Sequence, residues 1–104
     1  MKILAIEKNI PGVTDDQFTP YLLQAEAVQA WELTQQGSIR ESYFRADREE
    51  AVLILECNDL SEASKIINSL PLVEHRLISF ELIPLKPYPG FARLFGHQRS
   101  QSNE

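Results

Sequence analysis

The stretch IRESYFRADREEAVLILEC, residues 39–57, decides the fold of this chain. It holds two runs rich in branched and aromatic residues, 39–46 and 51–57, with the polar residues 47–50 between them. This pattern predicts two strands joined as a hairpin. The second run is the more apolar of the two, so we expect it to lie nearer the centre of a sheet.

One further strand and one helix are predicted on each side of the hairpin. Thr19 is a suitable N-cap before Pro20 for the first helix, and Gly37 is placed to end that helix. Asp59 or Ser61 can cap the second helix, which runs through Asn68. The two strands span residues 2–8 and 76–83, the first helix spans residues 20–36, and the second helix follows its cap and ends at Asn68.

The resulting order of strand, helix, strand, strand, helix and strand predicts an α+β fold. Right-handed crossovers place both helices on one face of a four-stranded antiparallel sheet. The strands at 2–8 and 51–57 carry apolar residues on both faces, so the face without helices needs a second sheet from another copy. We therefore expect a dimeric α/β barrel.

The chain after the last predicted strand is expected to form an arm. Prolines and Gly90 disfavour regular structure there, yet the segment is too apolar for a free tail. Its apolar residues are Leu85, Tyr88, Phe91, Leu94 and Phe95. We expect residues 84–96 to dock on a neighbouring subunit, residues 1–96 to form a single domain, and residues 97–104 to be a disordered tail.

Composition excludes several classes of protein. The 104 residues carry 10 Lys and Arg against 15 Asp and Glu, and this net charge of -5 has the wrong sign for binding nucleic acid or anionic membranes. No apolar run is long enough to span a membrane, and Glu7 and Lys8 interrupt the opening run before it could serve as a signal. We expect a cytoplasmic protein that associates with itself, because a domain this short buries little surface alone.

Glu26 is the strongest candidate for chemistry. It falls in the apolar half of the first predicted helix, the half that should face the sheet. That half is made of Leu22, Leu23, Ala27, Ala30, Trp31 and Leu33. Burial raises the pKa of a carboxyl group and lets it accept and return a proton near neutral pH. The alternative is a structural Glu26 that pairs with Arg40 or reaches the rim of the sheet.

Other polar residues are weaker candidates. Strict alternation divides the second strand into two faces, one with Arg40, Ser42 and Phe44 and the other with Ile39, Glu41, Tyr43 and Arg45. An Arg beside a Tyr on an edge strand can hold a carboxylate or lactone, or can equally be a solvated edge that blocks strand pairing. His75 can relay protons at the start of the fourth strand, or can be a surface loop residue. Glu7, Glu56 and Glu81 lie on three strands whose shared facing the sequence leaves open.

No metal and no cofactor are predicted. Neither His75 nor His97 lies in a spacing that resembles a set of metal ligands, and neither is placed as a haem ligand. The sequence has no glycine-rich nucleotide motif and no nucleophile elbow. Cys57 is the only cysteine and sits in an apolar strand, which favours a buried, inert thiol.

Several segments point to a known family. They are QAE at 24–26, LTQQG at 33–37, SLPL at 69–72, IPL at 83–85 and YP at 88–89, together with Arg40 and Tyr43. In these segments the chain resembles the muconolactone delta-isomerase family over most of residues 1–90. The resemblance implies a ferredoxin-like dimeric α/β barrel, sites near subunit interfaces, and proton transfer beside a lactone carbonyl without a cofactor. Enzymes of that family usually have Trp-Arg where this chain has Tyr43-Phe44, so only Glu26 and Arg40 carry over at matched positions.

Two hypotheses of function from different classes follow. The first is an isomerase-like enzyme that moves a proton within a small organic acid or lactone. In it Glu26 is the proton shuttle, Arg40 anchors an anion, and Tyr43 or His75 is an auxiliary donor. The second is a non-catalytic protein that binds a small ligand or supports oligomeric assembly, in which Glu26 affects stability or oligomer size and no reaction rate.

Overall fold

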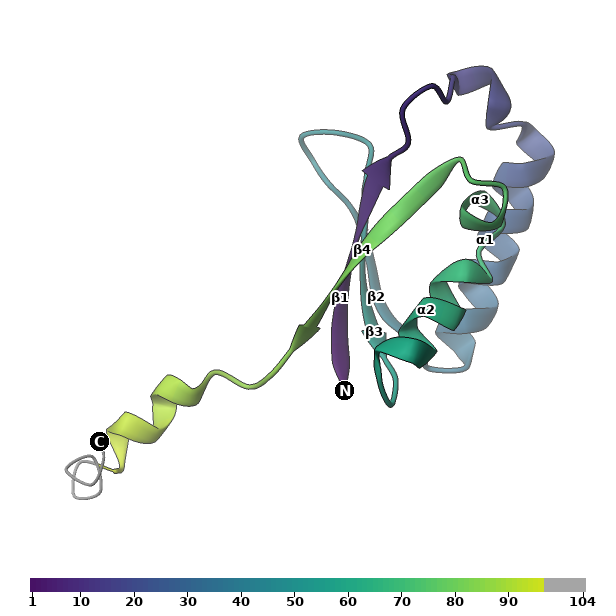
Figure 1. Cartoon of the computed structure of the whole chain (residues 1–104). Coiled ribbons are helices and arrows are strands. Elements are labelled where there is room, and N and C mark those ends of the chain that lie inside the picture. Colours follow the sequence, from purple (N-terminus) through teal and green to yellow (C-terminus); the bar gives the residue numbers. More distant parts are fainter. Residues whose placement is uncertain (97–104) are drawn as a thin grey trace.

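The predicted order of helices and strands is present in the computed structural model, which describes residues 1–96 (Figure 1). The predicted tail at 97–104 lies outside the described residues. The elements are β1 (Lys2–Asn9), η1 (Asp15–Gln17), α1 (Pro20–Gln35), β2 (Ile39–Phe44), β3 (Ala51–Glu56), α2 (Leu60–Asn68), α3 (Pro71–Glu74), β4 (Ile78–Leu85) and η2 (Pro89–Leu94). This confirms the α+β class and the ferredoxin-like arrangement.

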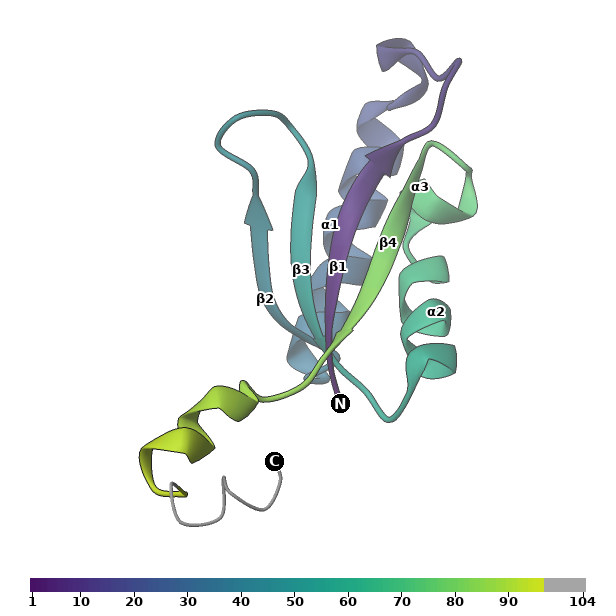
Figure 2. The same ribbon diagram turned by 60° about the vertical axis from the view of Figure 1, so that its left-hand side comes forward.

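The four strands form one antiparallel sheet in the order β2-β3-β1-β4. The apolar β3 is central and β2 is at an edge, as the composition of the hairpin predicts. Both α1 and α2 lie on the same side of the sheet, and the other side carries no helix (Figures 1 and 2). This is the layer order that right-handed crossovers impose.

The core lies between the sheet and the two helices. Ile3 of β1 stands opposite Leu55 of β3, and Ala5 stands opposite Leu53, so these four side chains share one face. They pack against Leu33 of α1 and Ala63, Ile66 and Ile67 of α2, and all eight are buried. Removing a Leu or Ile side chain of this kind from water contributes about 1.5–3 kcal/mol to stability.

The ends of α1 follow the predicted signals. The Thr19 side chain accepts a hydrogen bond from the Leu22 N–H at 3.2 Å, and Pro20 occupies the first helical position. Gly37 has a φ of 86°, the left-handed conformation that glycine adopts without strain. The following Ser38 N–H donates to the Leu33 carbonyl at 2.9 Å, which closes the helix with a Schellman motif.

Three predicted details differ from the structure. On α1, Trp31 is 63% exposed and Leu23 and Ala27 are exposed too, so the helix rests on a narrower stripe than the prediction gave it. The last strand runs through Pro84, because β4 is an edge strand and tolerates a residue that donates no hydrogen bond. The segment after β4 contains the 3-10 helix η2, although its prolines were expected to prevent regular structure.

Strand β2 contains a bulge that the sequence pattern did not reveal. The register shifts by one residue between Ile39 and Glu41, which leaves Arg40 as the extra residue. Ile39, Ser42 and Phe44 therefore face the helices, and Tyr43 stands opposite Val52 on the other face. The strict alternation expected for this strand was wrong at Ile39 and Arg40.

The sheet face without helices is apolar at its centre. We call it the bare face, and its half-buried apolar residues are Leu4, Ile6, Val52, Ile54 and Ile83. Beyond it, η2 extends away from the body of the molecule (Figure 1). Its neighbouring side chains Tyr88, Phe91, Leu94 and Phe95 are all exposed in the single chain.

Candidate functional site

A cavity of about 380 Å³ lies between α1 and the helix-covered face of the sheet. This volume is at the small end of the range for ligand pockets. Its lining is apolar except for Glu7, Glu26, Ser42 and Tyr43. The apolar lining residues are Leu23, Ala30, Ile39, Phe44, Ala51, Leu53, Leu70, Leu72, Ile78 and Phe80. Two carboxyl groups thus share one small apolar chamber.

Glu26 enters this cavity from the middle of α1. Its Oε1 accepts a hydrogen bond from the Leu72 N–H at 2.9 Å. Leu72 is the second residue of α3, whose N-terminal N–H groups have no partner within the helix, and its N-cap Leu70 has no side-chain acceptor. Glu26 therefore caps α3 with one oxygen. Burial raises the pKa of Glu26, the Leu72 hydrogen bond lowers it in part, and the charge of Glu7 raises it further.

Glu7 enters the same cavity from β1. Its position continues the buried series Ile3 and Ala5, and the residue is only 8% exposed. Its Oε1 accepts a hydrogen bond from the Ala51 N–H at 2.8 Å, at the start of β3. Burial raises the pKa of Glu7, the hydrogen bond from Ala51 lowers it in part, and nearby Glu50 raises it. Both cavity carboxyl groups consequently hold a proton to higher pH than an exposed glutamate does.

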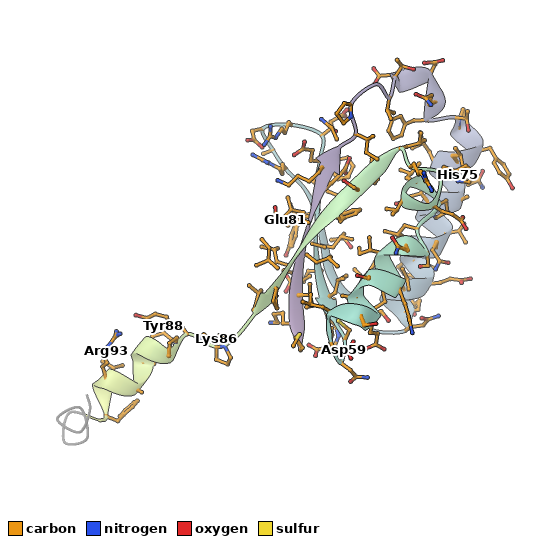
Figure 3. The ribbon with its side chains drawn as sticks, viewed as in Figure 1. Asp59, His75, Glu81, Lys86, Tyr88 and Arg93 are labelled. Carbon is orange, nitrogen blue, oxygen red and sulfur yellow. The ribbon has the colours of Figure 1, made fainter. Side chains whose placement is uncertain are left out.

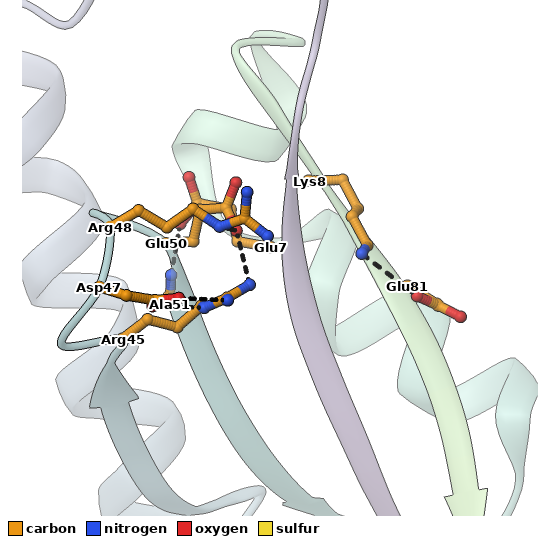
Figure 4. A network of polar contacts seen from close by, with 8 residues as sticks. All are labelled: Glu7, Lys8, Arg45, Asp47, Arg48, Glu50, Ala51 and Glu81. Atoms are coloured by element: carbon orange, nitrogen blue, oxygen red, sulfur yellow. Dashed lines mark hydrogen bonds and ion pairs between the residues drawn. The ribbon is translucent and has the colours of Figure 1, made fainter.

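An ion-pair network closes the hairpin end of the sheet (Figure 4). Arg45 lies 2.7 Å from Asp47 and 3.4 Å from Glu50, and Arg48 lies 3.1 Å from Glu50. The network thus pairs two arginines with two carboxylates. Its charges largely cancel, and neither arginine is among the residues that line the cavity.

A second hollow of about 740 Å³ adjoins the cavity and shares Glu7, Leu23, Phe44 and Leu72 with it. The loop that follows β1, residues 10–13, forms much of its wall.

A comparison with known families agrees with this architecture. The sequence matches the family model of muconolactone delta-isomerase over residues 3–90, which is most of the chain. The chain belongs to this family. No individual curated protein matches it.

Of the residues that the sequence proposes for a muconolactone isomerase-like site, the structure brings two to the cavity. Both Glu26 and Tyr43 are among its lining residues, but the Tyr43 side chain stands on the bare face, where its hydroxyl donates to Glu41 Oε1 at 2.7 Å. Arg40 is exposed, and its Nε donates to the Gly37 carbonyl at 2.9 Å. His75 is exposed after α3, with Nδ1 2.9 Å from the Pro71 carbonyl (Figure 3). Neither Arg40 nor His75 is among the described lining residues.

Glu7 is the residue whose place in the site the sequence left open. Glu7 lies on the same face of β1 as Ile3 and Ala5, because alternate residues of a strand share a face. Since β1 is apolar on both faces, the sequence did not show which of the two faces the helices cover. Glu56 stands opposite Lys2 on the bare face, and Glu81 lies there as well, 3.5 Å from Lys8 (Figure 3). Only one of the three strand glutamates therefore joins Glu26.

Within residues 1–96, no three His, Cys, Asp or Glu side chains gather closely enough to hold a metal ion. No helix in that range is long and apolar enough to cross a bilayer. Cys57 is buried, and burial raises the pKa of its thiol, which disfavours the reactive thiolate.

Proposed function

We propose that this protein is a cofactor-independent isomerase that transfers a proton within a small organic acid or lactone. The observation that carries the proposal is the pair Glu7 and Glu26, two carboxyl groups of raised pKa in one apolar cavity. Such groups can exchange protons near neutral pH, which is what general acid–base catalysis requires. Membership of the muconolactone delta-isomerase family supports the same reaction class.

The two glutamates take different roles in this mechanism. Ionised Glu26 removes a proton from the saturated carbon next to a C=C bond that is conjugated with the substrate carbonyl, and the electrons of that C–H bond move into the π system as an enolate. Glu7, whose pKa burial raises, donates a hydrogen bond to the enolate oxygen when it is in its neutral form. Glu26 then returns the proton to the carbon next to the carbonyl group, and the double bond has moved by one position.

The hydrogen bonds of the site make a clean test possible. In Glu26→Gln the amide oxygen still accepts from the Leu72 N–H, but the side chain carries no transferable proton. We expect at least about a 100-fold loss of turnover, since general acid–base groups contribute roughly 10²–10⁴. Isomerisation of muconolactone and exchange of its carbon-bound hydrogen with D₂O, both followed by NMR, are suitable assays.

Two further variants complete the experiment. Glu32→Gln removes an exposed carboxylate from the same helix and should leave the rate unchanged. Glu7→Gln keeps an N–H donor for the enolate oxygen and should lose less activity than Glu26→Gln. Full turnover by Glu26→Gln would remove Glu26 from the mechanism.

A second candidate function rests on the hydrogen bond between Glu26 and α3. If capping α3 is the whole role of Glu26, the protein binds a small ligand or supports assembly without catalysis. This alternative predicts that Glu26→Gln changes the melting temperature or the oligomer size and that neither the variant nor the parent protein exchanges substrate hydrogen. Any Glu26-dependent exchange decides against it.

We also propose that the protein works as a homodimer or a larger oligomer. The bare face is apolar along both central strands, and pairing it with the same face of a second copy would cover it. The exposed aromatic residues after β4 would then dock on a neighbouring subunit. Light scattering should detect a dimer or more, and Ile54→Glu, in the middle of the bare face, should give monomers. A monomeric parent protein would contradict this part of the proposal.

A further inference from the structure

The outer side of α1 carries an apolar stripe that is separate from the cavity. Tyr21, Val28 and Trp31 recur at helical spacing, so they share the side of the helix opposite to the one that buries Leu33 in the core. All three side chains are exposed in the single chain, and none of them is among the described residues that line the cavity. Large apolar side chains gathered in this way on a surface mark an interaction site.

The segment after β4 is a second exposed apolar surface, and its shape is fixed by its own contacts. We call residues 86–96 the arm. The rings of Tyr88 and Phe91 meet edge to face, with their centroids 4.9 Å apart. The Tyr88 ring also lies against Gly90, where a side chain of any other residue would collide with it. The arm is therefore pre-organised, which lowers the conformational entropy that it loses on binding.

The arm and the outer side of α1 carry charges of opposite sign. The arm contains Lys86 and Arg93 and no acidic residue, and both cations are exposed (Figure 3). Helix α1 contains Glu26 and Glu32 and no basic residue, and exposed Glu32 lies beside the apolar stripe. The rings of the stripe can bind a cation as well, because lysine and arginine are attracted to the faces of tryptophan and tyrosine. The two surfaces thus match in both apolarity and charge.

The arm lies far from the α1 of its own chain. It continues β4 beyond the end of the sheet and extends away from both helices (Figures 1 and 2). The bare face matches the arm less well, because its lysines face glutamates: Lys2 stands opposite Glu56, and Lys8 lies 3.5 Å from Glu81. The outer side of α1 in a second copy is the surface that complements the arm.

We infer that the arm of one copy docks on the apolar stripe of α1 in a second copy, with its aromatic rings against Tyr21, Val28 and Trp31 and its cations near Glu32. The inference rests on the proposed assembly and adds a second interface to it. Pairing of two bare faces joins like surfaces, whereas this contact joins unlike surfaces, so the two contacts together can link more than two copies.

Trp31 is the only tryptophan of the chain, so its fluorescence reports this contact directly. The emission maximum and acrylamide quenching are measured on the full-length protein. Since a docked arm shields a side chain that is otherwise 63% exposed, Phe91→Ala and Arg93→Glu should shift the emission to longer wavelength and raise the quenching constant at least about two-fold. Lys65→Glu, which reverses an exposed charge on α2, should leave both unchanged. Circular dichroism checks that each variant is folded.

The outcomes separate this inference from the proposed function. Equal quenching in the parent protein and both arm variants overturns the inference, and if Trp31 is shielded in all three, another surface covers it, such as the α1 of a second copy. Light scattering on the same samples reports the assembly. An assembled parent protein whose Trp31 does not respond to the arm keeps the assembly and refutes the docking. Trp31 shielded by the arm in a monomer also refutes it, because the arm then folds onto its own chain. No substrate enters these measurements, so they are independent of the isomerase reaction.

Discussion

The cap that Glu26 provides to α3 makes a quantitative prediction about stability. Replacing Glu26 by Ala and, separately, by Gln removes the charge in both cases, but only Gln can still accept a hydrogen bond from the Leu72 N–H. Leu70, the N-cap of α3, has no side-chain oxygen that could take over. The difference between the two variants therefore measures the cap itself.

The expected size follows from helix capping. Loss of a side-chain cap costs about 0.5–2 kcal/mol, and leaving a buried N–H unsatisfied costs about 1–3 kcal/mol. We expect Glu26→Ala to be less stable than Glu26→Gln by about 1–2 kcal/mol. At about 4–8 °C per kcal/mol for a domain of this size, the melting temperatures should differ by roughly 4–16 °C.

Thermal and urea unfolding followed by circular dichroism are the assays, at one pH and one protein concentration, because assembly makes the melting temperature depend on concentration. Glu26→Gln should be at least as stable as the parent protein at neutral pH, since it removes a carboxyl group that burial disfavours in its charged form. Equal melting temperatures for the Ala and Gln variants would refute the capping role and with it the placement of Glu26.

Three further predictions concern other parts of the chain. Because the pKa of Glu7 is raised above its usual value of 4.5, the folded state keeps this proton to higher pH than the unfolded state. Glu7 therefore contributes its full share of the unfolding free energy below pH 4.5, and this share is lost as pH rises through the pKa of the folded state. Urea unfolding at a series of pH values should show a smaller loss of stability in Glu7→Gln than in the parent protein. Arg76 has a φ of 60°, so Arg76→Gly should stabilise the protein by up to about 1 kcal/mol in urea unfolding, and a destabilised variant would contradict the strain. Buried Cys57 should react with an aromatic disulfide reagent only after unfolding, so rapid reaction of the folded protein would show that the strand opens.

Elements marked by strong local signals were predictable from the sequence. Thr19, Pro20 and Gly37 bound α1 because caps and left-handed residues act over a few neighbours. The relative apolarity of the two hairpin strands also gave their places in the sheet. Glu26 could also be identified from the sequence, because a carboxylate among apolar residues at helical spacing is a local signal.

Features that depend on distant contacts were not predictable. The short helix α3 is capped by Glu26, 46 positions before Leu72, and no local signal contains that contact. Glu7 joins the site because α1 covers one face of β1, and β1 itself is apolar on both faces. Trp31 belongs to the apolar half of α1 by periodicity, yet the helix rests on a narrower stripe, and the side chain is 63% exposed in the single chain.

The extra residue Arg40 in β2 affects how functional roles can be transferred within the family. A pairwise comparison that counts positions from Ile39 without allowing for it assigns Tyr43 and Phe44 to the wrong sides of the sheet. The ring of Phe44 then belongs to the helix-covered face, where the cavity lies, while the ring of Tyr43 belongs to the bare face. Sequence alignments of this strand should therefore be anchored on Ser42 and the β3 residue opposite it, Leu53, and not on the preceding arginine.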